Sequence, residues 1–315
     1  METSRRAVLN LVLPAVAAVS LSRHAQAKGD GVVPWSTGTE APTIAVPPGA
    51  TDCHHHIYDG RFPVAPGVAA KPADATATDY KKLQRRLGIS RHVVVQPSAY
   101  GVDNSCILDA MKQFGRVARG IAVVNTDVTD AELKRLNAAG IRGIRFNFAP
   151  AGATTPAMIA PLARRIAGMG WHVQLNADAD QIVSLADTLS ALPCPLVFDH
   201  LAHPPQPAGT SHPVFILVSR LLAAGKTWVK LSAAYADTKV GPPSYADTSA
   251  VAKAYVREAP ERLVWGSDWP HPSEPADRKP DDAKLLDLLA DWVPNKALRH
   301  RILVQNPEKL YGFPA

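Results

Sequence analysis

Short apolar runs rich in β-branched residues alternate along the chain with longer stretches of helical periodicity. The runs, which predict strands, are 51–58, 92–97, 120–125, 143–147, 171–176, 196–200, 228–232 and 263–268. Between them, segments such as TDAELKRLNAAG and PAMIAPLARRIAGMG repeat apolar residues at helical spacing, and several end in the glycine expected at a helix C-terminus. Eight strand–helix repeats predict an α/β fold, a (β/α)8 TIM barrel that spans residues 51–315 as one domain.

A doubly wound open sheet is the alternative to the barrel. That fold usually carries a glycine-rich phosphate-binding turn after its first strand. Here the sequence YDGRFP, residues 58–63, follows the first strand. The pattern therefore favours the barrel.

The first 27 residues differ in character from the rest of the chain. Arg5 and Arg6 precede an apolar run over residues 7–21, and a small-x-small sequence ends at Ala27. The run is too short to span a bilayer, which indicates a cleaved signal peptide and not a membrane anchor. The paired arginines favour the twin-arginine route over a Sec signal, and either route predicts a periplasmic protein. Residues 28–50 are expected to form an irregular leader.

Charge and cysteine content restrict the partners that we expect. The formal net charge is +6, and loss of residues 1–27 removes three arginines and one glutamate, which leaves +4. With no Lys/Arg tract, this charge predicts no nucleic-acid partner, and we expect a small-molecule substrate and no membrane contact after cleavage. Cys53, Cys106 and Cys194 show no C-x-x-C spacing, so we expect buried thiols, although one disulfide stays open.

The first predicted strand, within DCHHHIYD, holds three successive histidines. In a barrel, alternate residues of a strand point to the lumen, and the active site forms at the C-terminal ends of the strands. Strict alternation places Asp52, His54 and His56 on the lumen face and Cys53 and His55 against the helices. The triplet therefore predicts a His-x-His pair.

The other strands also end in polar residues: Gln96, Ser98, Asn125, Arg145, Asn147, Asn176, His200, Ser232 and Asp268. Polar groups that converge in this way are costly to bury unless they bind something. His203, in the loop after the sixth strand, suits either a surface or a pocket. His92 and His172 stand at strand starts and are interpreted as structural. Lys230 is either a buried ion-pair partner or a carboxylate anchor, and Asp199 is expected to hold a neighbouring ring or backbone group.

Several motifs resemble the amidohydrolase-related barrel hydrolases. They are DCHHHIYDGRFPVAP, VVVQPSAYGVDN, IRGIRFNF, GWHVQLNAD, LVFDHLAHP, VKLSAAY, LVWGSDWPHP and NPEKLYGF, spread in order over residues 51–313. The subgroup that they resemble includes 2-pyrone-4,6-dicarboxylate lactonase, 4-sulfomuconolactone hydrolase and D-galactarolactone isomerase. Because one fold hosts many reactions, the resemblance does not by itself fix the substrate.

The resemblance implies a catalytic set of His54, His56, His200 and Asp268. Asp268 would activate water while the three histidines polarise a lactone carbonyl. Isomerisation by proton abstraction at Asp268 and internal transfer competes with hydrolysis. The remaining alternative is not an enzyme but a periplasmic protein that binds sugar acids without turning them over.

The resemblance also bears on the substrate. The family's fourth-strand arginine matches Arg145, whereas three further arginines of the pyrone dicarboxylate lactonase are replaced by Ala151, His203 and Ala236, and its fifth-strand tyrosine by Asn176. A pocket with one arginine suits a lactone with one carboxylate or none, from a sugar acid or an aromatic-degradation intermediate. The expected substrate-binding residues are Arg145, Gln96, Ser98, Asn147, Asn176, Ser232 and His203.

Metal dependence is a separate question. Arg145 stands where binuclear members of this superfamily carry a carboxylated lysine, so two metals are not expected. One zinc ion could be held by His54, His56, His200 and Asp268. The fifth-strand histidine that usually completes such a site is absent, however, and Asn176 lies near its place. We therefore expect that no cofactor is required, with a zinc-dependent hydrolase or decarboxylase as the alternative.

Overall fold

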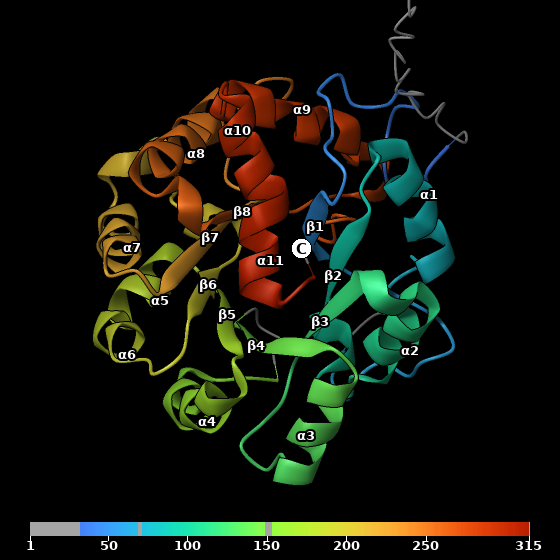
Figure 1. The fold of residues 1–315 in the computed structure, drawn as a ribbon, viewed down its shortest axis with the longest axis vertical. Coiled ribbons are helices and arrows are strands. Elements are labelled where there is room, and N and C mark those ends of the chain that lie inside the picture. Colours follow the sequence, from blue (N-terminus) through green and yellow to red (C-terminus); the bar gives the residue numbers. More distant parts are fainter. Residues whose placement is uncertain (1–31, 69–70, 149–152, 315) are drawn as a thin grey trace, which may run out of the picture.

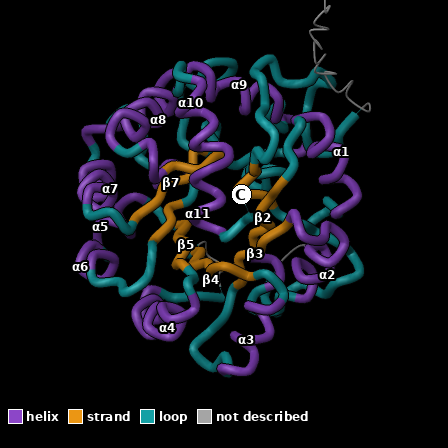
Figure 2. The backbone as a smooth tube through the Cα atoms, in the orientation of Figure 1, coloured by secondary structure: helices purple, strands orange, loops and turns teal. Residues whose placement is uncertain are grey.

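Eight parallel strands form one sheet in the order β1 to β8, and helices surround it (Figures 1 and 2). This computed structural model describes residues 32–68, 71–148 and 153–314. The predicted signal peptide, the first four residues of the predicted leader and Ala151 lie outside these residues. The described leader, 32–50, has neither helix nor strand, as expected. The predicted (β/α)8 barrel is confirmed.

The strands are β1 (Thr51–His55), β2 (Arg91–Val95), β3 (Ala118–Ala122), β4 (Ile141–Asn147), β5 (His172–Asn176), β6 (Leu196–Phe198), β7 (Thr227–Leu231) and β8 (Leu263–Trp265). The helices are α1 (Ala77–Leu87), α2 (Ser105–Phe114), α3 (Asp130–Ala138), α4 (Ile159–Ile166), α5 (Ala179–Ser184), α6 (Ala186–Ser190), α7 (Pro213–Ala223), α8 (Ala246–Glu258), α9 (Asp282–Trp292), α10 (Lys296–His300) and α11 (Asn306–Tyr311). None of the helices described is long and apolar enough to cross a bilayer.

Several strands end before their predicted limits. The predicted strands 51–58, 196–200 and 263–268 stop at His55, Phe198 and Trp265. As a result His56, His200 and Asp268 lie in the loops that leave the C-terminal rim of the barrel. The polar character that marked these positions belongs to the loops over the site and not to the strands.

The start of α1 shows how the sequence fixes one of the outer helices. Thr76 Oγ1 accepts from the backbone N of Asp79, and the Asp79 carboxylate accepts from the backbone N of Thr76, which forms a capping box. Gly88 ends the helix with a φ of 70°, a conformation that glycine adopts without strain. The helix thereby holds Tyr80 and Leu83 fully buried against the barrel.

A bulge in β1 corrects the predicted alternation. Its pairing with β2 sets Asp52 opposite His92 but His55 opposite Val94, so two residues of β1 stand against one of β2. Such an extra residue reverses the facing of the side chains before it. Strict alternation from Asp52 to His56 is therefore wrong.

The bulge exchanges the two residues at the start of the motif. Asp52 points toward α1 and accepts hydrogen bonds from Tyr80 Oη at 2.9 Å and Ser267 Oγ at 2.6 Å. Cys53 instead packs in the barrel lumen with Val93 and Val197. The predictions that Asp52 faces the lumen and Cys53 the helices are both wrong. All three cysteines are free and buried.

The remaining histidines of the strands occupy packing positions, as expected. His55 faces the helix layer, where its ring stacks on Tyr80 with centroids 3.6 Å apart, and its Nε2 lies 2.9 Å from His92 Nδ1. His172 is buried at the start of β5 against the ring of Tyr311. These contacts fit the structural interpretation of His92 and His172.

Residues after β8 close the barrel against β1. The backbone N of Asp268 donates to His54 O at 2.7 Å, and the backbone N of His56 donates to Trp269 O at 2.8 Å. Gly266 permits this approach, because a Cβ at that position would lie 2.6 Å from the Cβ of His54. The closure places His54, His56 and Asp268 side by side.

A network of buried charges fills the lumen below the rim. Asp199 Oδ1 lies 3.3 Å from Lys230 Nζ, and its Oδ2 accepts from Arg145 Nε and Gln174 Nε2, each at 3.1 Å. Lys230 also donates to Gln174 Oε1 at 2.8 Å. Burial would raise the pKa of Asp199, but the charges of Lys230 and Arg145 hold it well below its usual value. The structure thus makes Lys230 an ion-pair partner.

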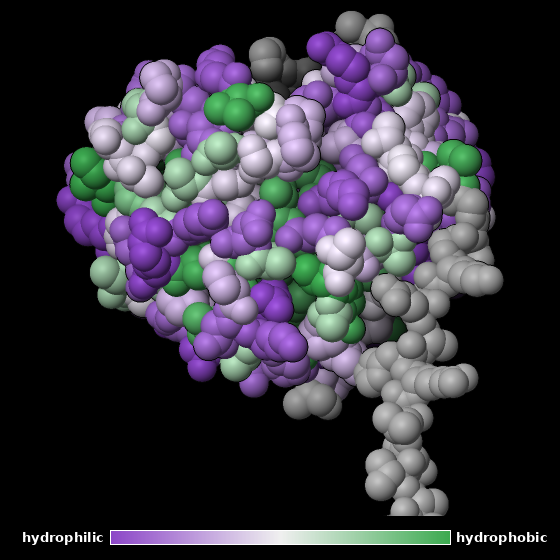
Figure 3. Space-filling view, turned by 90° about the horizontal axis from the view of Figure 1, so that it is seen from above, coloured by the Kyte–Doolittle hydropathy of each residue, from purple (hydrophilic) through white to green (hydrophobic). Residues whose placement is uncertain are grey.

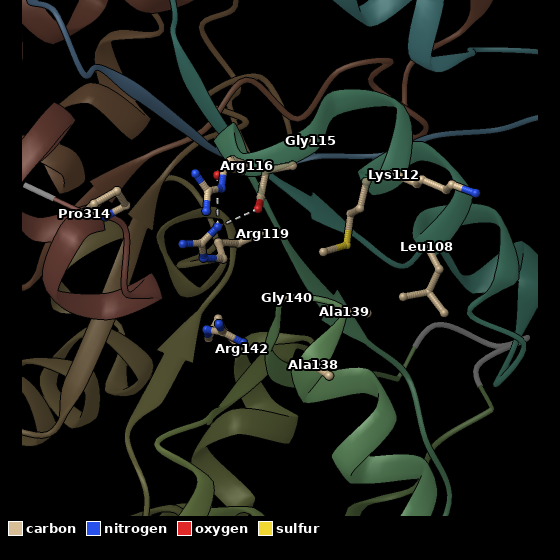
Figure 4. A pocket seen from close by; sticks show the side chains of 12 residues that line it. Leu108, Lys112, Gly115, Arg116, Arg119, Ala138, Ala139, Gly140, Arg142 and Pro314 are labelled. Carbon is tan, nitrogen blue, oxygen red and sulfur yellow. Dashed lines mark hydrogen bonds between the residues drawn. The ribbon is translucent and has the colours of Figure 1, made fainter.

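A wide cleft lies at the opposite end of the barrel, where the strands begin. Its volume is about 830 Å³, and its lining includes Arg116, Arg119 and Arg142, which Figure 4 shows near one another. The guanidinium of Arg119 is already hydrogen-bonded within the protein. It donates to the backbone carbonyls of Arg116, Ala118 and Gly312. No carboxylate, histidine or cysteine is among the described residues that line this cleft. The charged side chains among these residues, those of Lys112 and the three arginines, are all basic.

Large apolar side chains on the surface are isolated from one another. On the face shown in Figure 3, hydrophilic residues predominate and apolar residues are scattered between them. The exposed large apolar residues of the described chain are Val32, Val102, Val117, Ile216 and Val240. Single exposed residues of this kind are ordinary for a globular protein and mark no site.

The lumen network predicts unequal costs for the removal of its charges. Asp199→Asn leaves two buried cations without a counter-charge, whereas Lys230→Met leaves the balanced Asp199 and Arg145 pair. We expect Asp199→Asn to lower the free energy of unfolding by about 3–5 kcal/mol and Lys230→Met to lower it by less. Urea unfolding of both variants measures this difference. An equal or larger loss in Lys230→Met would contradict the charge balance described.

Candidate active site

A cavity of about 340 Å³ opens at the C-terminal ends of the strands. Of the residues predicted to act there, the lining includes His56, Ser98, Arg145, Asn147, Asn176, His200, His203 and Asp268. Tyr58, Ala233 and Ala236 also line it. The structure thus gathers residues from seven strands or the loops that follow them around one cavity of the size that binds a small molecule.

Asp268 stands among three imidazole rings. Its Oδ1 lies 3.4 Å from His54 Nε2, 3.5 Å from His56 Nε2 and 3.7 Å from His200 Nε2. This oxygen is buried and has no hydrogen-bond partner among the described residues. Burial would raise the pKa of Asp268, but the surrounding imidazoles, His200 first, hold it well below its usual value, because even as neutral rings they direct N–H dipoles at the carboxylate. The carboxylate is therefore ionised, with one oxygen available for chemistry.

His54 is connected to the charge network of the lumen. Its Nδ1 lies 3.1 Å from Lys230 Nζ and 3.1 Å from Asp199 Oδ1. Of the two contacts, the one to Lys230 has hydrogen-bond geometry, and Asp199 Oδ1 accepts no hydrogen bond from the described residues. Burial, reinforced by the charge of Lys230, lowers the pKa of His54 well below its usual value. Asp199 thus lies against the ring of His54, Lys230 makes the hydrogen bond to that ring, and the ring is neutral.

The other two imidazoles have defined hydrogen-bond partners. His56 Nδ1 donates to Val95 O at 2.8 Å, so in the neutral ring Nε2 carries a lone pair. His200 Nδ1 lies 2.9 Å from Ser232 Oγ, and burial lowers the pKa of His200 to about 4. When Ser232 donates to Nδ1, the Nε2–H of His200 is free to act as a donor at the cavity.

A left-handed turn carries two of the site histidines. The φ values of His200, Leu201, Ala202 and His203 are 48°, 58°, 61° and 52°. For residues with a Cβ this conformation costs about 1–2 kcal/mol each, so the surrounding structure must hold it. Ala202 N donates to Asp199 O at 2.8 Å, and His203 N donates to His200 O at 3.1 Å. The turn lets His200 and His203 both face the cavity.

A chain of hydrogen bonds forms the polar wall of the cavity. His203 Nδ1 lies 2.9 Å from Asp237 Oδ2, and its Nε2 lies 2.9 Å from Asn176 Oδ1. Asn176 Nδ2 donates to Asn147 Oδ1 at 3.1 Å, and Asn147 Nδ2 donates to Ser98 Oγ at 2.6 Å. Burial would lower the pKa of His203, but Asp237 raises it above its usual value. His203 is thus a pocket residue whose charge is balanced by Asp237.

Two residues predicted to bind substrate lie outside the cavity lining. Gln96 is fully buried, and its amide nitrogen donates to Gly101 O at 3.3 Å and to Asp103 O at 2.7 Å. Gln96 therefore holds the loop after β2. Ser232 lies behind the ring of His200. Both residues shape the site indirectly in this structure.

Sequence analysis missed Tyr235, which contacts Asp268 directly. The phenol Oη of Tyr235 lies 2.6 Å from Asp268 Oδ2. The residue follows β7 in the motif VKLSAAY, so its place after a strand end was the available signal. It lies three residues beyond the predicted strand 228–232, and its aromatic ring gave no sign of a polar contact.

The side chains also fit a metal ion. Ligand atoms of His54, His200 and Asp268 all lie within 4.8 Å of one another, and His56 Nε2 lies 3.2 Å from His54 Nε2. Tetrahedral zinc with Zn–N bonds of about 2.0–2.1 Å separates its ligand atoms by roughly 3.3 Å. The unpaired Oδ1 of Asp268 and the lone pair of His56 are ligands that zinc accepts. The four residues are therefore able to hold one ion.

The tautomer of His54 distinguishes the metal-free state from the metal-bound state. When Lys230 donates to Nδ1, the ring proton is on Nε2, which donates to His56 Nε2 at 3.2 Å. The lone pair of His56 is then satisfied without a metal. When Nδ1 carries the proton toward Asp199, two bare Nε2 atoms and a carboxylate oxygen face one another and require a cation.

Comparisons with known proteins agree with this geometry. The family model described as "Amidohydrolase" matches residues 51–313. A 2-pyrone-4,6-dicarboxylate hydrolase of Comamonas testosteroni is 36% identical over 90% of this chain and 97% of its own length. A D-galactarolactone isomerase of Agrobacterium fabrum is 32% identical over 86% of this chain and 94% of its own.

A solved structure shares the fold at similar identity. It is the apo form of an Agrobacterium tumefaciens protein, 31% identical, with a TM-score of 0.80 over 89% of this chain and 99% of that chain. The range matched by the family model, 51–313, includes the four residues of the site. This chain belongs to the amidohydrolase family.

Proposed function

We propose that this protein is a hydrolase that opens the ring of a lactone, with Asp268 as the general base. The observation that carries the proposal is the ionised Asp268 carboxylate, whose unpaired Oδ1 lies among three imidazoles beside a cavity. The proposal is supported by relatives that include the pyrone dicarboxylate hydrolase and a 4-sulfomuconolactone hydrolase of Rhizobium radiobacter, which is 36% identical over 86% of this chain.

The reaction follows from the positions of the donors and acceptors. Asp268 Oδ1 takes a proton from a water molecule as the water oxygen bonds to the lactone carbonyl carbon. The Nε2–H of His200, adjacent to Asp268, stabilises the negative charge that develops on the carbonyl oxygen. The ring C–O bond then breaks, and the leaving oxygen takes the proton back from Asp268. The product is a hydroxy acid, which releases one proton at neutral pH.

We propose that turnover does not require a metal. A bound zinc ion, held by His54, His56, His200 and Asp268, would supply Lewis-acid polarisation of the carbonyl. The Lys230 ammonium group, 3.1 Å from His54 Nδ1, favours instead the tautomer in which the imidazoles satisfy one another. A lactone is an activated ester, so it needs less polarisation than an amide.

The cavity suits a lactone with a single carboxylate. Arg145 lines the cavity and uses its Nε on Asp199, and among the described residues its two terminal nitrogens have no hydrogen-bond partner, so they suit a ligand. His203 does not add a second anion site, because Asp237 already balances it. Asn147, Asn176 and Ser98 supply groups for hydroxyls. A sugar-acid lactone or a monocarboxylate lactone of aromatic degradation has this chemistry.

Lactone isomerisation is the second candidate, favoured by the similarity to a D-galactarolactone isomerase. In that reaction Asp268 would take a proton from a substrate hydroxyl, whose oxygen would attack the carbonyl in place of water. The site geometry is the same for both reactions. The product distinguishes them, because hydrolysis adds a water and isomerisation leaves the mass unchanged.

The role of Asp268 is tested with a panel of aldonolactones and muconolactones. We expect Asp268→Asn to lose roughly 10²- to 10⁴-fold in kcat because the general base is gone. Proton release followed with a pH indicator gives the rate, and mass spectrometry of the product separates hydrolysis from isomerisation. Asp127→Asn, the same change at an exposed position, is the control. Full activity of Asp268→Asn on every lactone turned over refutes the proposal.

Metal independence predicts activity that survives chelation. Protein purified without added zinc, treated with a chelator and dialysed, should retain its kcat, and metal analysis should find zinc well below one ion per chain. Addition of zinc should not raise the rate. Near-stoichiometric zinc together with loss of activity on chelation, restored by zinc, would contradict metal-independent turnover.

We also propose export to the periplasm, on the basis of Arg5, Arg6 and the apolar run that follows them. N-terminal sequencing of protein recovered from the periplasm of a bacterial host should begin near Lys28. Lysine substitution of both arginines should stop export by the twin-arginine route. A full-length chain found only in the cytoplasm would refute the proposal.

A further inference from the structure

A second set of buried polar residues lies behind Asp268. Tyr235 Oη is 2.6 Å from Asp268 Oδ2 and 2.9 Å from His271 Nδ1, and His271 Nε2 is 3.1 Å from Asp282 Oδ2. Tyr235, His271 and Asp282 are buried, and none of them lines the 340 Å³ cavity. The three residues come from the loop after β7, the loop after β8 and the first turn of α9.

The hydrogen bonds that link Asp268, Tyr235 and His271 have only one possible direction. A tyrosine phenol has an ordinary pKa of about 10, so at neutral pH Tyr235 keeps its proton. An ionised carboxylate only accepts, and the phenol therefore donates to Asp268 Oδ2. Its single proton is then used, so its oxygen must accept from Nδ1–H of His271. Each donor thus points toward Asp268.

Asp282 is the last residue in this row of hydrogen bonds and holds the ring of His271. His271 Nδ1 carries a proton, so His271 Nε2 and Asp282 Oδ2 share one further proton between them. Asp282 is the first residue of α9, where the helix dipole stabilises a negative charge. Lys279 donates to His271 O at 2.7 Å and so holds the loop that presents the imidazole.

This row of hydrogen bonds explains why one oxygen of Asp268 is hydrogen-bonded and the other is not. Oδ2 is occupied by the phenol, whereas Oδ1 accepts no hydrogen bond from the described part of the chain and faces His54, His56 and His200. Without the phenol the carboxylate could rotate and accept from an imidazole, which would remove its free oxygen. The loops after β7 and β8 together supply this restraint.

We propose that Tyr235, His271 and Asp282 are positioning residues that hold Asp268 with Oδ1 free for the reaction. This inference rests on the role of Asp268 as general base proposed above. It differs from a purely structural role, in which the three residues would only join the β7 and β8 loops to α9. A structural role affects stability, whereas a positioning role affects kcat and leaves substrate binding unchanged.

Tyr235→Phe is the first test, because it removes the hydroxyl and keeps the ring. We expect kcat to fall about 10- to 100-fold, the range typical for partners that orient a reacting group, with KM and the unfolding midpoint close to those of the unmodified protein. Tyr255→Phe is the matched control, because Tyr255 is buried and its hydroxyl has no partner among the described residues. Its kcat should not change. An unchanged kcat in Tyr235→Phe overturns the proposal.

Two substitutions of His271 give a second test that does not depend on packing alone. Asparagine places an amide nitrogen near the position of Nδ1 and can still donate to Tyr235, whereas glutamine reaches the position of Nε2 and donates only toward Asp282. We expect His271→Asn to retain more kcat than His271→Gln. Equal loss in both variants, with a fall in the unfolding midpoint, overturns the positioning role.

The same experiments separate this proposal from the proposed function. If Asp268→Asn keeps full activity, the general base has been misassigned and both proposals fail. If Asp268→Asn is inactive while Tyr235→Phe is fully active, the proposed function stands and only the positioning role fails. Both variants are assayed in the full chain with the same lactone.

Discussion

The buried carboxylate of Asp199 is the constraint on which the lumen and the active site both depend. It lies within 3.3 Å of Lys230 and accepts from Arg145, so it balances two cations that the barrel could not otherwise bury. Through the same cluster it contacts His54, which stands at the reacting end. The cluster that stabilises the lumen therefore also surrounds the first site histidine, whose pKa is lowered by burial and by the charge of Lys230.

Backbone geometry then fixes the other reacting groups. Gly266 lets the segment after β8 approach His54 closely, and the backbone hydrogen bond from Asp268 to His54 sets the two side chains together. Asp268 has a φ of 62°, and the turn that begins at His200 is left-handed throughout. Strained residues of this kind persist only where the surrounding contacts hold them, and here they carry the site.

The sequence predicted the barrel and the cavity because both follow from patterns with a simple period. Strand ends marked by polar residues located His200 and Asp268 without any knowledge of their partners. The bulge that turns Cys53 into the lumen was not predictable, because one extra residue leaves the local composition unchanged. Gln96 looked like a ligand for substrate, but its partners lie in a loop whose path only the structure shows.

The central claim is that a lactone binds with its carbonyl between Asp268 Oδ1 and His200 Nε2. A crystal structure of Asp268→Asn with an intact lactone tests this most directly. The account predicts the carbonyl oxygen within hydrogen-bond distance of His200 Nε2, a water between the carbonyl carbon and residue 268, and any substrate carboxylate on Arg145. A lactone whose carbonyl points toward the polar wall of Asn147 and Asn176, away from residue 268, would contradict it.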